Sequence, residues 1–219
     1  MADLIAGLRA EVVRRNLERV RAEIADAGRD PAEVEILAAI KYLPAAELAA
    51  LAGGGVAVVG ENRAQDLIAK QDVAGDAFTW DFIGQLQSRK VRDLVGRVRY
   101  IQSVASDSAL TQLGRHGTAA TEVMIEVNVA GEQGKSGIAP SELTGFIERC
   151  PVRVVGLMTM PPRADDAERN RPYFAALRAL ADRHRLRHAS MGTSQDYAVA
   201  AAEGATIVRL GTSLYRETA

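Results

Sequence analysis

The alternation of strand-like runs with helix-like segments constrains the fold of this chain more than any other feature. From residue 35 onward, eight short apolar runs are separated by segments of helical composition. The runs are EILAAIK (35–41), VAVVGEN (56–62), FTWDFIG (78–84), RYIQSVA (99–105), EVMIEVN (122–128), VRVVGLM (152–158), HASMGTS (188–194) and TIVRLGT (206–212). Continuous apolar strands joined by crossover helices predict a parallel sheet that is covered on its faces. Eight such units predict an α/β fold, a single (β/α)8 TIM barrel, with an open doubly wound sheet as the alternative.

The length of the chain predicts one domain, residues 1–219. A barrel of this kind has roughly 250 residues, and little chain follows Thr212 to form an eighth helix. In residues 1–30, apolar side chains recur at roughly helical spacing at Leu4, Ile5, Leu8, Val12, Leu17, Val20 and Ile24. We expect this N-terminal segment to be an amphipathic helix that packs on the barrel and fills the missing flank.

Composition argues against several classes of protein. The formal net charge of -1 gives no bulk attraction to nucleic acid or to anionic membranes. No apolar run approaches the roughly 20 residues of a membrane helix, and the N-terminus lacks the apolar core of a signal peptide. The single cysteine, Cys150, cannot form an intramolecular disulfide, which is compatible with a reducing compartment. We therefore expect a cytoplasmic protein with neither nucleic-acid nor membrane partners.

Four strand ends carry the polar residues from which a site can be built. Lys41 closes the first run, Asn62 closes the second, and SMGTS and RLGTS close the seventh and eighth. In a barrel all four project from the carboxyl-terminal rim, where barrel enzymes have their active sites. The glycines, hydroxyls and backbone amides of the last two predict a phosphate-binding site.

Lys41 is a charged residue at the end of an otherwise apolar run. A lysine that is partly desolvated at a barrel mouth loses some of its preference for the charged form, and a neutral amine attacks aldehydes. An amine facing a phosphate site fits pyridoxal 5′-phosphate (PLP), and Arg209 is expected to face inward beside its ring. The alternatives are a Lys41 that simply extends into water and an Arg209 in an ordinary salt bridge.

Seven stretches, in order along nearly the whole chain, resemble the pyridoxal phosphate homeostasis proteins, the YggS/PROSC-like group. That family is related in fold to the N-terminal barrel of alanine racemase. The stretches are AIKYLP (39–44), GENRAQD (60–66), WDFIGQLQSRK (80–90), EVNVAGEQGKSG (126–137), GLMTMPP (156–162), SMGTSQD (190–196) and VRLGTSLY (208–215).

The resemblance implies which residues hold the cofactor. PLP would form a covalent aldimine with Lys41, Arg209 would lie against the pyridine nitrogen, and Asn62 and Met191 would lie beside the ring. Phosphate contacts are implied for Ser190, Gly192, Ser194, Gly211 and Thr212. Because a permanently charged arginine does not protonate the ring nitrogen, the bound cofactor is a poor electron sink.

The implied function is PLP binding and a part in intracellular PLP homeostasis or delivery, as a non-catalytic carrier with at most weak side activity. Related racemases take a second base from a carboxyl-terminal β domain, for which these 219 residues leave no room. The expected partners are PLP and apo forms of PLP-dependent enzymes, and an uncapped rim suggests a monomer.

Two other functions stay open. A small PLP-dependent racemase or lyase needs a second base opposite Lys41, for which Tyr42 and Tyr197 are candidates. A barrel that binds another phosphorylated metabolite, with Lys41 as a plain cation, needs no covalent adduct.

Three positions depart from the family pattern. The family usually has His where this chain has Asp81, which predicts an acidic neighbour of the site. Thr193 replaces a usual Met and adds a hydroxyl near the phosphate loop. Tyr215 and Arg216 replace a Phe-Gly pair at the edge of the site.

Several other signals are weaker. GEQGKSG ends like a nucleotide-binding P-loop, but Val129 stands where that motif needs glycine. Lys135 in this stretch is expected to be a solvated charge or to meet free cofactor or a partner. His184 and His188 could share a helix face, but flanking arginines argue against a metal site. The run 183–188 lacks the aromatic residues of a nucleic-acid patch.

Overall fold

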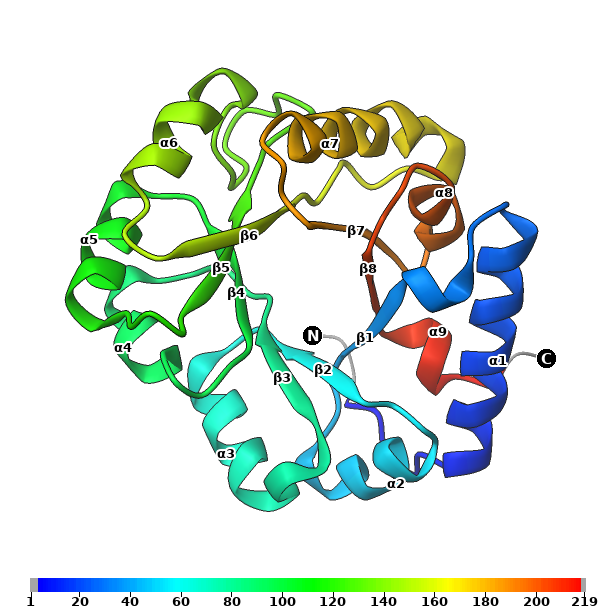
Figure 1. Ribbon diagram of the computed structural model, residues 1–219. Coiled ribbons are helices and arrows are strands. Elements are labelled where there is room, and N and C mark those ends of the chain that lie inside the picture. Colours follow the sequence, from blue (N-terminus) through cyan, green and yellow to red (C-terminus); the bar gives the residue numbers. More distant parts are fainter. Residues whose placement is uncertain (1–3, 218–219) are drawn as a thin grey trace.

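A computed structural model describes residues 4–217 as a closed barrel of eight parallel strands in chain order (Figure 1). The strands are β1 (Glu35–Ala39), β2 (Val58–Glu61), β3 (Thr79–Phe82), β4 (Tyr100–Val104), β5 (Glu122–Glu126), β6 (Arg153–Met158), β7 (His188–Thr193) and β8 (Ile207–Leu210). Pairing of β1 with β8, which sets Leu37 opposite Arg209, closes the ring. Each strand lies within one predicted run, so the barrel prediction is confirmed and the open sheet is excluded.

Helices surround the barrel and connect its strands. After β1 to β8, in turn, come α2 (Leu48–Gly53), α3 (Ala64–Ala74), α4 (Val91–Leu94), α5 (Asp107–His116), α6 (Leu143–Arg149), α7 (Arg171–Arg183), α8 (Tyr197–Ala202) and α9 (Thr212–Tyr215). Short 3-10 segments are η1 (Pro31–Glu33), η2 (Ala45–Glu47), η3 (Gly75–Ala77), η4 (Ser88–Lys90), η5 (Pro140–Glu142) and η6 (Ala167–Asn170). None of the helices formed by residues 4–217 combines the length and hydropathy needed to cross a membrane.

The N-terminal helix α1 (Ala10–Asp26) lies beside α9 and also contacts α2 and α8 (Figure 1). Its buried apolar face consists of Val12, Val13, Leu17, Val20 and Ile24. The short α9 leaves this side of the barrel open, and α1 covers it. The prediction that the N-terminal segment fills the missing flank is confirmed.

The predicted start of that helix is wrong. Gly7 has a φ of +72°, which interrupts a helix, and the Glu47 carboxylate accepts hydrogen bonds from the amides of Gly7 (2.9 Å) and Leu8 (2.8 Å). Leu4 is exposed, whereas Ile5 borders a cavity on the barrel rim. Residues 1–3 of the predicted segment lie outside the described residues.

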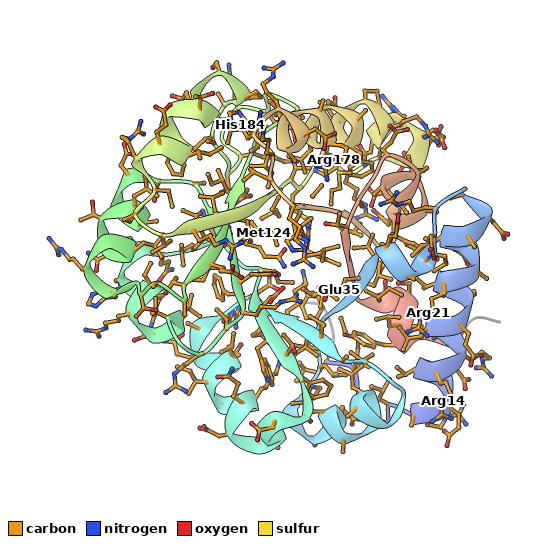
Figure 2. The ribbon with its side chains drawn as sticks, viewed as in Figure 1. Arg14, Arg21, Glu35, Met124, Arg178 and His184 are labelled. Carbon is orange, nitrogen blue, oxygen red and sulfur yellow. The ribbon has the colours of Figure 1, made fainter. Side chains whose placement is uncertain are left out.

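Strand side chains alternate between the barrel interior and the layer beneath the helices, because successive strand residues point to opposite faces. The interior cluster is Leu37, Val58, Tyr100, Met124, Val155, Met158 and Ile207. Figure 2 shows Met124 within the ring of strands, whereas Arg14 lies outside it on α1. A larger cluster fills the space between strands and helices and includes Leu17, Leu67, Phe174 and Leu214. The interior is therefore packed, and a binding site has to form at its rim.

Candidate functional site

A cavity of about 640 Å³ lies where the strands end at the carboxyl-terminal rim. Residues that follow β1, β2, β3, β6, β7 and β8 contribute to its wall. Of the nine residues predicted for cofactor binding, those that line it are Lys41, Asn62, Ser194, Arg209, Gly211 and Thr212. The fold therefore gathers residues from both ends of the chain around one space.

Lys41 stands at the corner of a turn that follows β1. The strand ends at Ala39, and the Leu43 amide donates to the Ile40 carbonyl at 2.9 Å, which places Lys41 at the second position of the turn. Its side chain is exposed, with Nζ 4.7 Å from the centre of the Tyr42 ring. The partial desolvation expected for this amine is therefore not supplied by the protein alone.

Arg209 crosses from β8 into the barrel interior and reaches the cavity. It is 5% exposed, and its guanidinium donates to Ser190 Oγ (2.6 Å) and to the Thr159 carbonyl (2.8 Å). A third contact joins it to Met160 Sδ at 2.9 Å. Burial lowers the pKa of Arg209 to about 10, and the nearby Glu126 carboxylate opposes this shift. The group is a fixed cation at neutral pH.

The loops after β7 and β8 are tied together by side chains. Ser194 Oγ accepts hydrogen bonds from the amides of Gly211 (3.1 Å) and Ser213 (3.3 Å). Asp196 Oδ1 accepts from the Thr193 amide (2.7 Å) and from the Thr193 hydroxyl (3.0 Å). Three amides of the expected phosphate cradle are thus bound within the chain, and the hydroxyl of Thr193 points to Asp196.

Three predicted residues, all in β7, do not line the cavity. Ser190 lies inside the barrel and donates to Gln102 Oε1 at 2.6 Å. Met191 points the other way and is fully buried between strands and helices, so its side chain does not lie beside the cavity. Gly192 has a φ of +89°, and a Cβ there would come within 2.6 Å of Ala200 Cβ. This glycine lets α8 pack closely on β7.

Asn62 lies against Gly84, in the segment that follows β3. A Cβ on Gly84 would lie 1.9 Å from the Asn62 carbonyl oxygen, so a glycine is required there. Within residues 4–217, Asn62 Oδ1 is a buried acceptor without a hydrogen-bond partner. Such an atom carries a desolvation cost of about 1–3 kcal/mol. A ligand that donates a hydrogen bond to it would remove this cost.

Glu126 and Tyr215 are polar residues of the wall that do not belong to the nine predicted cofactor-binding residues. Glu126 ends β5, is 8% exposed and accepts a hydrogen bond from Ser136 Oγ at 2.8 Å. Burial raises the pKa of Glu126, and the bond from Ser136 opposes that shift. The buried Tyr215 donates its hydroxyl proton to the Ala39 carbonyl at 3.1 Å, and burial raises its pKa. The period-two alternation of EVMIEVN puts Glu126 on the same face of the strand as Met124, and this pattern could have predicted that Glu126 points into the barrel.

Asp81 is not an acidic neighbour of the cavity. Its carboxylate lies in the barrel interior and accepts from Arg99 Nε (3.0 Å), Arg99 Nη2 (2.8 Å) and Gln102 Nε2 (2.7 Å). Burial raises the pKa of Asp81, while the hydrogen bonds and charge of Arg99 lower it. The expectation fails because Asp81 points down the barrel, toward the amino-terminal ends of the strands, where Glu35 also binds Arg99.

The candidate second bases do not stand opposite Lys41. Tyr42 occupies the same turn as Lys41, with the amine over its ring. Tyr197 donates its hydroxyl proton to Glu23 of α1, outside the barrel. Neither side chain therefore faces Lys41 across the cavity.

The two histidines, whose spacing of four would allow a shared helix face, do not lie on one helix. His184 follows the last residue of α7, whereas His188 begins β7 and lies 3.3 Å from the Tyr100 hydroxyl. Lys135 lies in the loop after β5, where it pairs with Glu132. These residues lie outside the set that lines the cavity.

Comparison with known proteins decides the family. The alanine racemase N-terminal domain family matches residues 9–219. A pyridoxal phosphate homeostasis protein of Aquifex aeolicus is 38% identical over 221 residues, covering 94% of this chain and 97% of that protein. The chain belongs to the pyridoxal phosphate homeostasis protein family. Another family member, from Pseudomonas aeruginosa, is 35% identical over 94% of each chain, and the resemblance inferred from the seven stretches is confirmed.

Solved structures share the fold. PipY of Synechococcus elongatus, solved with PLP bound, has a TM-score of 0.79 at 31% identity, covering 93% of this chain and all of that one. A protein of Bifidobacterium adolescentis reaches a TM-score of 0.85 at 31% identity over 98% of each chain. Alanine racemase of Corynebacterium glutamicum shares the fold, with a TM-score of 0.70 at 16% identity over 98% of this chain and 63% of the racemase.

Proposed function

We propose that this protein binds PLP in the rim cavity, holds it as an aldimine on Lys41 and serves PLP homeostasis or delivery without efficient catalysis. The observation that carries the proposal is the meeting of Lys41, Arg209 and the two hydroxyl-bearing loops around one cavity. Similarity to PipY, a protein 31% identical to this chain that has been solved with PLP bound, supports the choice of ligand.

The donors and acceptors of the wall fit the chemistry of PLP. Lys41 supplies an amine for the aldehyde, and Ser194 and Thr212 supply hydroxyls for the phosphate. Arg209 supplies a fixed positive charge for the pyridine nitrogen, which it can bind but not protonate. The buried Asn62 Oδ1 is an acceptor that the chain leaves unpaired within its described residues, as a site for a polar ligand requires.

PLP supplies an electrophilic aldehyde, and the chain supplies the nucleophile. With PLP bound, Lys41 would supply the amine for a C=N bond to the aldehyde carbon, and the aldehyde oxygen would leave as water. Exposure of Lys41 at the rim supports a carrier, because an incoming amine can reach the same carbon and release the lysine.

One observation favours the enzyme alternative. Glu126 is a buried carboxyl group in the cavity wall, and its raised pKa lets it hold a proton at a higher pH than an exposed glutamate does. A weak racemase or lyase would use such a group for proton transfer. Amino-acid turnover that disappears in Glu126→Gln but not in Glu142→Gln, at an exposed residue of η5, would support the enzyme.

The test of the proposed function is trapping of the adduct. Purified protein is loaded with PLP, its visible absorption is recorded, and borohydride reduction is followed by peptide mapping with mass spectrometry. We expect the modification on Lys41, its loss in Lys41→Ala and its retention in the control Lys135→Ala. Saturable binding of PLP by wild type with no reducible adduct would instead favour a site that uses Lys41 as a plain cation.

Delivery to apo forms of PLP-dependent enzymes, a monomeric state and a cytoplasmic location stay predictions. Delivery is checked by mixing loaded protein with an apo-aminotransferase in the presence of a phosphatase that destroys free PLP. Activation faster than that given by an equal concentration of free PLP would support transfer by direct contact.

A further inference from the structure

The turn that carries Lys41 is held from behind by a buried lysine. The Ile40 carbonyl, which closes the turn, accepts from the Leu43 amide (2.9 Å) and from Lys70 Nζ (2.7 Å). Lys70 lies on α3 and is 8% exposed. Its ammonium also donates to Glu61 Oε2 at 2.5 Å, and Glu61 is fully buried at the end of β2.

The second carboxylate oxygen of Glu61 binds the backbone of Asn62, which lines the cavity. Glu61 Oε1 accepts from the Asn62 amide at 2.5 Å and more weakly from the Arg63 amide at 3.4 Å. The pair formed by Glu61 and Lys70 thus binds the backbone next to Lys41 and the backbone of Asn62. Two cavity residues from neighbouring strands are fixed to one buried group.

The side chain of Lys41 is exposed, so few neighbouring side chains hold it in place. Its direction therefore depends mainly on the backbone to which it is attached. The Ile40 carbonyl belongs to the peptide plane that leads into Lys41, so its orientation sets where the Cα–Cβ bond of Lys41 points. The preceding carbonyl, of Ala39, is held by the Tyr215 hydroxyl at 3.1 Å. Both peptide groups before the turn are thereby immobilised by side chains from other elements.

A buried ion pair is a poor source of stability, which makes its placement here informative. Removing two charges from water costs several kcal/mol per ion, and well-packed apolar residues often replace such pairs without loss of stability. The contacts made here are to the backbone of the site rather than to distant core residues. This pattern is expected of a pair that orients groups.

We propose that Lys70 and Glu61 are positioning residues that hold Lys41 and Asn62 in the orientation needed to receive an aldehyde-bearing ligand. They act through the Ile40 carbonyl and the Asn62 amide, and neither lines the cavity. The inference rests on the proposed function for the identity of the ligand. Orientation of a nucleophile matters for rate, since a misplacement of about 1 Å can cost on the order of 100-fold.

The test removes both charges together, because removing one leaves the other buried and unpaired. The variant is Glu61→Met with Lys70→Met, which keeps side-chain volume and abolishes the bonds to Ile40 and Asn62. The matched control is Lys90→Met with Asp93→Leu, an ion pair of 3.3 Å that does not line the cavity.

Two readouts are taken besides thermal unfolding. Hydrogen exchange in protein without PLP reports the Leu43 and Asn62 amides, whose partners are the Ile40 carbonyl and Glu61. The rate at which PLP forms a borohydride-reducible adduct on Lys41 reports orientation. In the double variant we expect cooperative unfolding, exchange at both amides at least about tenfold faster, and adduct formation slower by on the order of 10- to 100-fold. The control should match wild type in both.

Exchange and adduct formation as in wild type, in a folded double variant, would overturn the inference while leaving the proposed function intact. If wild-type protein forms no adduct, the proposed function fails, and amide exchange alone decides whether the pair holds the turn. Should the double variant not fold, Lys70→Arg replaces it, since arginine keeps the charge and displaces the donors. Slower adduct formation at an unchanged melting temperature then supports the inference, and an unchanged rate contradicts it.

Discussion

Bonds from side chains to the backbone shape the site at the scale of single residues. Ser194 joins the loops after β7 and β8 by accepting from two amides of the second loop, those of Gly211 and Ser213. Gly84 gives the chain room to pass the Asn62 carbonyl. These contacts place the polar groups of the rim.

Replacement of Ser194 by alanine should loosen the phosphate end of the cavity. The two amides that it accepts from lose their partner, which costs about 1 kcal/mol in the free energy of unfolding. We expect PLP to bind several-fold more weakly as judged by spectroscopic titration, and denaturant unfolding to show the loss of stability. Ser141→Ala, at an exposed residue of η5, is the control. A dissociation constant equal to that of wild type would show that Ser194 does not organise the site.

The pairing of α1 with α9 matters most at the scale of elements. A four-residue helix is unstable by itself, and α9 is held by bonds from α1. Asn16 Nδ2 donates to the carbonyls of Leu214 (3.1 Å) and Arg216 (2.9 Å), and Arg19 Nη2 donates to that of Ser213 (3.0 Å). The N-terminal helix therefore supports the loop that carries Thr212.

Substitution of Asn16 by leucine tests this support. The change keeps the number and branching of the side-chain heavy atoms but leaves two carbonyls without that donor, which should lower the free energy of unfolding by about 1–3 kcal/mol. PLP binding should weaken as well, because α9 begins at Thr212. Denaturant unfolding and ligand titration measure the two effects. Arg15→Ala, at an exposed residue of the same helix, should change stability by less than about 0.5 kcal/mol. Equal stability of both variants would contradict the role given to Asn16.

A polar network runs through the barrel at the scale of the whole molecule. It connects the rim cavity with the opposite end through Arg209, Ser190, Gln102, Asp81, Arg99 and Glu35. Each buried member has a partner within the network, as buried polar groups require. Inward-facing polar residues are thus accommodated in an otherwise apolar interior.

His188 lies at the same amino-terminal end of the barrel. Its shifted pKa leads to a prediction of how the free energy of unfolding depends on pH. Burial, and next the charge of Arg187, lower the pKa of His188 to about 4, while Glu35 opposes and Arg99 and Arg178 add to the shift. An unfolded histidine has a pKa of about 6.5, so between these values the unfolded state binds a proton that the folded state excludes. The free energy of unfolding should fall as pH is lowered through this window.

The size of that loss should be about 1 kcal/mol, below the full linkage value because the ring is partly exposed to solvent. Denaturant unfolding at a series of pH values measures it. His188→Asn should remove this part of the pH dependence, whereas His116→Asn, at an exposed residue of α5, should leave it. An identical slope in wild type and His188→Asn would contradict the prediction.

The sequence by itself determined the elements, the barrel and the family. Periodicity and short motifs are local, so the eight strands and the rim positions of Lys41, Asn62 and the last two loops follow from neighbouring residues. The family resemblance implies Met191 beside the ring, whereas its side chain packs between the strands and the helices, a direction that alternation along β7 does not reveal by itself.

Only the tertiary structure decided which side chains meet. Asn16 and Leu214 are separated by 198 residues, and Lys70 reaches a carbonyl 30 residues away. The sequence predicts Asp81 as a neighbour of the site, but its carboxylate binds Arg99, which also binds Glu35 at the amino-terminal end of the barrel. Such contacts depend on barrel closure and on the direction of each side chain, which arise from long-range packing and have no signature in the residues next to them.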